Sequence, residues 1–121
     1  MNKNVLPFLK KAKQRIEGGW CQNHCALDKH GDPVIPASKD AVRFCIVGSA
    51  RATELDFEES ERFLLREEAY AYLCLGLPDH WRNQLPRWND FDIRTKEEVL
   101  ALFDKAIKMV EDGVELDCAE D

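Results

Sequence analysis

Four side chains that can bind zinc lie close together after the first predicted helix: Cys21, His24, Cys25 and His30. Thiolate and imidazole groups suit tetrahedral zinc. However, His24 and Cys25 are adjacent and cannot easily point at one ion, and the chain has no paired Cys-x-x-Cys motifs. The alternative is that Cys21 is buried beside Trp20 while both histidines are solvated. We therefore expect no metal or other cofactor, and keep the four residues as secondary metal-ligand candidates.

Cys21 is also a candidate nucleophile. His24, His30 or His80 could act as its base, with Asn89 or Asp90 orienting that histidine. No recognisable catalytic signature surrounds Cys21, and five cysteines with three histidines make such trios easy to assemble by chance. A cysteine-dependent hydrolase or transferase is thus an alternative, and we expect a protein that is not an enzyme.

A third set of side chains could form a polar binding site for a small molecule or metal: Trp20, Cys21, Gln22, Trp88, Asn89, Asp90 and Arg94. Arg94 could bind a carboxylate or phosphate through its planar fork. The alternative is structural. Asn89 and Asp90 would then tie a turn, and Arg94 would pair with Asp90 or Asp92. We expect the two tryptophan segments to meet. An open cavity between them would indicate a site, and a closed contact would indicate scaffold.

The largest cluster of charge is acidic and lies in residues 54–68. Its carboxylates are Glu54, Asp56, Glu58, Glu59, Glu61, Glu67 and Glu68. Such a run is commonly a solvated helix face. It could instead bind a basic protein surface. We predict the partner surface at Glu54, Glu58, Glu59 and Glu61.

Hydrophobic periodicity predicts four main helices and a short one. The main helices are placed at residues 4–17, from an N-cap at Ser38 to Ala52, from a capping box at Asp56 to Gly76, and from a capping box at Thr95 to Gly113. The short helix is placed at residues 79–85. Residues 20–38 form a long irregular loop, in which Val34-Ile35 could be a short strand.

Three local assignments follow from the same pattern. The apolar run 41–48 could be a buried strand, but the Ser38 cap and the continuing sequence favour a helix. The third main helix is assigned a buried side that includes Leu64, Tyr70 and Cys74. Residues 88–90 are assigned to a turn that leads into the last helix.

The length of 121 residues and the predicted helices indicate one all-α domain, residues 1–121, folded as a compact bundle. The hydrophobic fraction of 45% and charged fraction of 33% fit a globular protein. The net charge of -6 argues against direct nucleic-acid binding or an anionic membrane surface. No apolar run approaches the ~20 residues that span a bilayer. The first residues have no leader pattern, so we expect a cytoplasmic protein with reduced cysteines. The acidic tail, residues 114–121, is expected to be flexible.

Several motifs together resemble a known family. They are Gly-Trp-Cys-Gln at residues 19–22, Phe-Cys-x-x-Gly at residues 44–48, Trp-Asn-Asp at residues 88–90, and the stretch from Arg94 through Ile107. The chain resembles a family of small bacterial and phage proteins of unknown function. That resemblance implies a fold group and a set of positions, not a reaction. We expect an interaction or regulatory module, phage or mobile-element encoded, that binds a protein partner with a basic surface.

Overall fold

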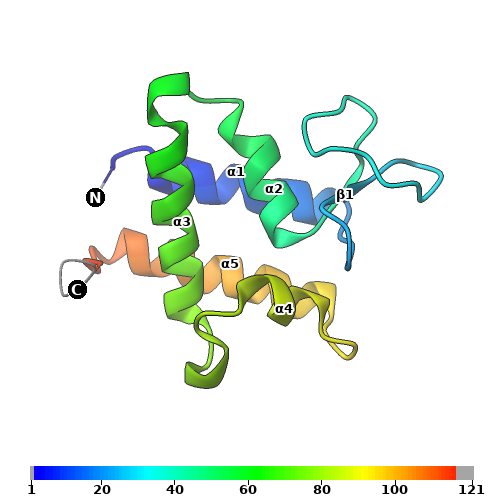
Figure 1. Cartoon of the computed structure of the whole chain (residues 1–121). Helices are drawn as coiled ribbons and strands as arrows, with labels where there is room; N and C mark the ends of the chain where they lie inside the picture. Colours follow the sequence, from blue (N-terminus) through cyan, green and yellow to red (C-terminus); the bar gives the residue numbers. More distant parts are fainter. Residues whose placement is uncertain (1, 117–121) are drawn as a thin grey trace.

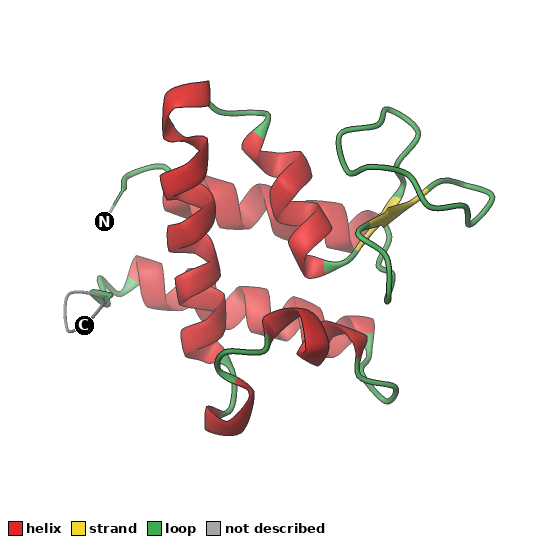
Figure 2. Cartoon of the chain, in the orientation of Figure 1, coloured by secondary structure: helices red, strands yellow, loops and turns green. Residues whose placement is uncertain are grey.

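The computed structural model describes residues 2–116 and is mostly helical, in agreement with the predicted class. The α-helices are α1 (Val5–Gly18), α2 (Ile46–Glu54), α3 (Arg62–Gly76), α4 (Leu85–Asp90) and α5 (Lys96–Glu111). Two 3-10 helices, η1 (Glu59–Glu61) and η2 (Asp79–Trp81), precede α3 and α4. The strands β1 (Ala26–Leu27) and β2 (Arg43–Phe44) form a small antiparallel sheet, which the prediction did not include (Figure 2).

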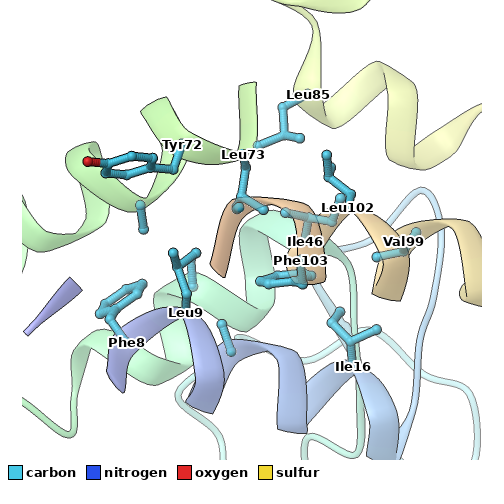
Figure 3. Packing of buried hydrophobic residues seen from close by; sticks show 14 of the residues in the cluster. Phe8, Leu9, Ile16, Ile46, Tyr72, Leu73, Leu85, Val99, Leu102 and Phe103 are labelled. Carbon is cyan, nitrogen blue, oxygen red and sulfur yellow. The ribbon is translucent and has the colours of Figure 1, made fainter. Parts of the chain in front are cut away.

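The core lies where α1, α2, α3 and α5 meet. In Figure 1, α1 and α5 run side by side and α3 crosses both, while α2 packs against α1 and α3. Phe8 and Leu9 of α1, Tyr72 and Leu73 of α3, and Phe103 of α5 belong to one hydrophobic cluster, from which the Tyr72 hydroxyl points outward (Figure 3). All five side chains are fully buried, and burial of this apolar surface is the main force holding the helices together.

The first and last helices confirm the predicted periodicity. Helix α1 buries Val5, Phe8, Leu9, Ala12 and Ile16, and α5 buries Val99, Leu102, Phe103, Ala106 and Val110. The capping box at the start of α5 is present. The hydroxyl oxygen of Thr95 accepts from the Glu98 N–H at 3.2 Å, and the Glu98 carboxylate accepts from the Thr95 N–H at 2.9 Å. Both pairs satisfy N–H groups that a helix start leaves free.

The second predicted helix is wrong at its start. Helix α2 begins at Ile46, with Cys45 as its N-cap, and residues 43–44 are strand. Phe44 is held extended because its N–H donates to the Gly19 carbonyl at 2.9 Å and its own carbonyl accepts from the Cys21 N–H at 3.1 Å. The Ser38 hydroxyl oxygen accepts from the nearby Asp40 N–H, and the Ser38 carbonyl accepts from the Ala41 N–H. The cap pattern at Ser38 therefore makes a local turn, and residues far away in sequence decide where the helix begins.

Helix α3 also departs from the prediction. It begins at Arg62 after the turn of η1, and no side chain caps it, so the capping box at Asp56 is wrong. Its buried side carries Leu65, Ala69, Tyr72, Leu73 and Gly76. Leu64 is 65% exposed, so the predicted buried side is wrong at that position, and Tyr70 and Cys74 are only half-buried.

Residues 88–90 form the last turn of helix α4, not a free turn. Pro86 stands in the first turn of this helix, where a missing N–H costs nothing. Trp88 and Asn89 are buried, and the helix gives way to extended backbone at Phe91. The short helix predicted at residues 79–85 is split between η2 and the start of α4.

The segment after α5 is attached to the core. The buried Tyr72 hydroxyl donates to the Val114 carbonyl at 2.6 Å, and Leu116 packs against the hydrophobic cluster. Residues 117–121 of the predicted flexible tail lie outside the described residues. None of the helices within residues 2–116 is long and apolar enough to cross a membrane.

Candidate functional site

The structure brings residues 20–23 and residues 88–90 together at one buried amide, the side chain of Asn89, and this contact is called the tryptophan junction below. Asn89 is 1% exposed. Its side-chain oxygen accepts from the Trp20 indole N–H at 2.9 Å and from the Ile46 backbone N–H at 3.1 Å. Its side-chain nitrogen donates to the Cys21 carbonyl at 3.2 Å and to the Asp90 carboxylate at 2.9 Å. The amide thus joins the segment after α1, the start of α2 and the end of α4, and all four of its hydrogen-bonding positions are used.

Gln22 and Asn23 add hydrogen bonds from the segment after α1 to the end of α4. The Gln22 side-chain nitrogen donates to the carbonyls of Asn89 at 3.0 Å and Phe91 at 2.8 Å. These carbonyls lie at the end of α4, where a helix leaves acceptors unpaired. The Asn23 N–H donates to the Asp90 carboxylate at 2.9 Å, and Asn23 has a left-handed φ of 70°. Asparagine tolerates this conformation better than most residues. Gln22 therefore serves as a cap supplied from another part of the chain.

Arg94 is engaged by the junction as well, but not by the predicted partners. Its Nε donates to the Trp88 carbonyl at 2.8 Å, and its guanidinium lies 4.0 Å from the Trp88 ring centre. Its ion pair is with Glu98 at 3.3 Å, so the predicted pairing with Asp90 or Asp92 is wrong. The face of an indole ring attracts a positive charge, so this stacking stabilises the Arg94 guanidinium over Trp88. The planar fork covers Trp88 and is not presented to a ligand.

Most polar groups of the predicted binding site are used in contacts within the protein, and only Asn89 and Asp90 border a cavity. Trp88, Asn89 and Cys21 are buried. In the described part of the chain, every buried side-chain nitrogen or oxygen has a hydrogen-bond partner. A buried polar network that is fully satisfied rigidifies and specifies a fold. The arrangement matches the scaffold alternative of the sequence prediction.

A small cavity of about 230 Å³ lies beside this junction. Its lining includes His24, Cys25 and Cys45, and also Asn89 and Asp90 of the predicted binding site. Asp90 and Pro86 border it from α4. Cys21 is absent from the lining, so the cavity does not present the predicted nucleophile.

The chemistry of Cys21 is unsuited to nucleophilic attack. Burial, followed by the nearby Asp90 charge, raises the pKa of the Cys21 thiol to about 11. The thiol donates to the His24 backbone carbonyl at 3.3 Å and not to an imidazole. Burial raises the pKa of Cys45 to about 12 in the same way. Because the thiolate is the reactive form, both thiols should react slowly with reagents from solution at neutral pH.

The four predicted metal-ligand candidates are not gathered around one point. His30 lies in an exposed turn in which its N–H and that of Asp32 donate to the Asp28 carboxylate. Within residues 2–116, no group of three or more His, Cys, Asp or Glu side chains is arranged to hold a metal ion. The Cys21 thiol is already engaged with the His24 carbonyl.

The acidic surface is divided between engaged and free carboxylates. Glu54 forms an ion pair with Arg66, and Glu61 accepts from the Asn4 side chain at 3.0 Å. Glu58 and Glu59 are exposed in the connection between α2 and α3. Of the four predicted partner-surface residues, these two are therefore best placed to meet a partner.

Two neighbouring apolar side chains whose exposure the prediction missed follow those carboxylates closely in the sequence. Phe63 is 61% exposed and Leu64 is 65% exposed, both in the first turn of α3. A signal for this was present in the sequence. Residues 63–65 are three consecutive large apolar residues, and one narrow helix face cannot bury all three. Leu65 is the one that faces the core.

The chain was compared with known proteins at the level of families, curated proteins and solved structures. No curated protein and no solved structure matches it. A family model described as a family of unknown function, DUF6197, matches residues 1–109. That range contains the Trp20–Asn89 junction, both strands and most of α5. The chain therefore belongs to DUF6197, a family of unknown function.

Proposed function

We propose that this protein is a non-catalytic interaction module that binds a partner protein at the start of α3. The surface consists of Leu55, Glu58, Glu59, Phe63 and Leu64, and is called the α3 docking surface below. The observation that carries the proposal is the exposure of Phe63 and Leu64 next to free carboxylates. Large apolar side chains grouped on a surface commonly mark contacts with other proteins.

Energetics support this use of the surface. Fully burying a leucine or phenylalanine side chain stabilises a complex by about 1.5–3 kcal/mol, and both side chains here are more than half exposed. The Arg66 guanidinium lies 5.6 Å from the Phe63 ring centre and supports the aromatic side chain on one side. A partially pre-positioned aromatic side chain loses less entropy on binding.

The carboxylates indicate the chemistry of the partner. Glu58 and Glu59 lie on a protein with a net charge of -6, and complementary charge raises the rate of encounter. We infer a partner surface with lysine or arginine around an apolar centre, such as one face of an amphipathic basic helix. Raising the salt concentration should slow association because it screens exposed charges.

The alternatives have less support. A small-molecule or metal site at the tryptophan junction would need free polar groups, yet the Asn89 amide is fully used. A cysteine hydrolase or transferase would need a thiolate, yet burial raises the pKa of Cys21 to about 11. Alkylation by iodoacetamide tests the alternative of a cysteine enzyme. We expect Cys21 to react about a hundredfold more slowly than free cysteine at neutral pH, and faster as pH rises. Rapid labelling at neutral pH would favour the cysteine enzyme.

Photo-crosslinking tests the interaction proposal. A photoreactive phenylalanine analogue is placed at Leu64, and in a matched control at Ile93, which is 76% exposed in the turn between α4 and α5. The variants are made in cells that naturally produce the protein. We expect one specific adduct from position 64 and none of the same mass from position 93.

The crosslinked partner then provides a quantitative test. With purified partner, the double change Phe63→Ser and Leu64→Ser should weaken binding at least about tenfold, because burial of both side chains is lost. Ile93→Ser should leave binding unchanged. Equal crosslinking from both positions, or unchanged affinity of the double variant, would contradict the proposal.

A further inference from the structure

Two cysteines lie at opposed positions just beyond one end of the small sheet. The register pairs Ala26 with Phe44 and Leu27 with Arg43. One step further along the same antiparallel register, Cys25 lies opposite Cys45. The Cys45 N–H donates to the Cys25 carbonyl at 3.2 Å, which confirms that the strands are still in contact at this position.

This geometry suits a disulfide. Opposed residues of an antiparallel pair place their side chains on the same face, with Cβ atoms about 4.5–5.5 Å apart. Disulfides need Cβ atoms about 3.5–4.5 Å apart, so a small adjustment is enough. Both cysteines line the cavity of about 230 Å³, which leaves room for their sulfur atoms to approach.

The two thiols differ in access. Cys25 is exposed, whereas Cys45 is buried and its sulfur accepts from the Gly48 N–H at 3.2 Å as the N-cap of α2. A reagent in solution therefore reaches Cys25 first. Because Cys45 is buried, it can react only with a group inside the protein, and the Cys25 sulfur lines the same cavity.

We propose that Cys25 and Cys45 form a reversible disulfide when the protein meets a small-molecule disulfide such as oxidised glutathione. In the first step the Cys25 thiolate attacks one glutathione sulfur, and a glutathione thiolate leaves. In the second step Cys45 loses its proton to solvent, its sulfur attacks the Cys25 sulfur, and the second glutathione thiolate leaves. The protein loses two electrons and two protons, and the two glutathione molecules take up the same number.

Cys21 is excluded as the partner by its place in the structure. It lies on the opposite side of β2, where its N–H donates to the Phe44 carbonyl. Its thiol is engaged by the His24 carbonyl, and it does not line the cavity. The bond between Cys25 and Cys45 would close the base of the loop that connects β1 to β2, residues 28–42. The oxidised protein would then hold that loop covalently as well as by strand pairing.

Mass spectrometry tests the proposal directly. The reduced full chain is treated with oxidised glutathione, blocked with iodoacetamide, and digested with trypsin without reduction. Cys25 falls in residues 16–29 and Cys45 in residues 44–51, so the disulfide joins two separate peptides. We expect these two peptides linked with a loss of two hydrogen atoms, and their separation after treatment with dithiothreitol.

Three serine variants supply the controls. Cys21→Ser should keep the linked peptides, which assigns the bond to Cys25, because both cysteines lie in the same tryptic peptide. Cys25→Ser and Cys45→Ser should each abolish the link. Serine is a favoured N-cap residue, so Cys45→Ser should retain α2, as circular dichroism would verify. A link that survives Cys25→Ser, or a Cys25–glutathione adduct that never proceeds to the linked form, would overturn the proposal.

Discussion

The tryptophan junction and the α3 docking surface make opposite use of residues that attract attention in the sequence. The junction gathers amide, indole, carboxylate and guanidinium groups, yet its central amide is buried and fully paired. The docking surface is built from ordinary leucine, phenylalanine and glutamate, yet its side chains face water. The difference teaches that a side chain can bind a partner only if it is exposed and not already paired, whatever its chemical type. Availability depends on contacts between distant parts of the chain.

The largest expected effect concerns the centre of the junction. Asn89→Leu removes four hydrogen bonds and leaves the Trp20 and Ile46 N–H groups without their acceptor. We expect a loss of about 3–5 kcal/mol in the free energy of unfolding, since each buried unpaired group costs about 1–3 kcal/mol. Urea denaturation followed by circular dichroism measures it. A loss below about 1 kcal/mol would mean that the junction is not the scaffold described here.

A second large effect is expected where α2 approaches the segment before β1. A Cβ atom on Gly48 would lie 1.8 Å from the Cys25 carbonyl oxygen. Gly48→Ala should therefore destabilise the fold by about 1–3 kcal/mol, the usual cost of overpacking. Gly18→Ala is the matched control, because nothing lies within 4 Å of the added atom. That control should be neutral or slightly stabilising, by up to about 1 kcal/mol. Equal thermal stability of the two variants would contradict the close approach.

A smaller effect is expected at the edge of the junction. Gln22→Ala removes the two hydrogen bonds to the Asn89 and Phe91 carbonyls, but both acceptors can be reached by water at this half-buried position. We expect a loss of about 1 kcal/mol in the free energy of unfolding. Hydrogen exchange should show faster opening of α4 than of α1. Unchanged exchange in α4 would show that Gln22 does not hold the end of that helix.

The smallest effect on stability is expected at the docking surface. Phe63→Ser with Leu64→Ser should change the free energy of unfolding by no more than about 0.5 kcal/mol, as is usual for exposed positions. The same double variant is the one expected to lose partner binding. A large loss of stability would show that these side chains support the fold, and the contrast between the two regions would disappear.

Sequence periodicity was sufficient to predict α1 and α5 because their buried residues repeat at helical spacing and their ends carry local signals. It failed for α2 because Phe44 bonds to Gly19 and Cys21, which lie more than twenty residues earlier in the chain. It failed for Leu64 because two adjacent leucines fit the pattern and only packing selects Leu65.

The candidate site was predicted in part. The meeting of the Trp20 and Trp88 segments was anticipated, and the structure brings both to Asn89. The Ile46 N–H could not be anticipated as a partner because the start of α2 had been misplaced. The opposition of Cys25 and Cys45 was missed for the same reason, since a helix through residue 45 excludes strand pairing there.

The Tyr72 hydroxyl, bonded to the Val114 carbonyl, joins the middle of α3 to the segment that follows α5. Val114 lies beyond the residues that the family model matches. A shortened chain that ends at Asp112 would keep the shared portion and yet expose a phenol that is otherwise shielded. Nitration of Tyr72 by tetranitromethane would then become fast, so this one tyrosine can report when the end of the chain detaches from the core.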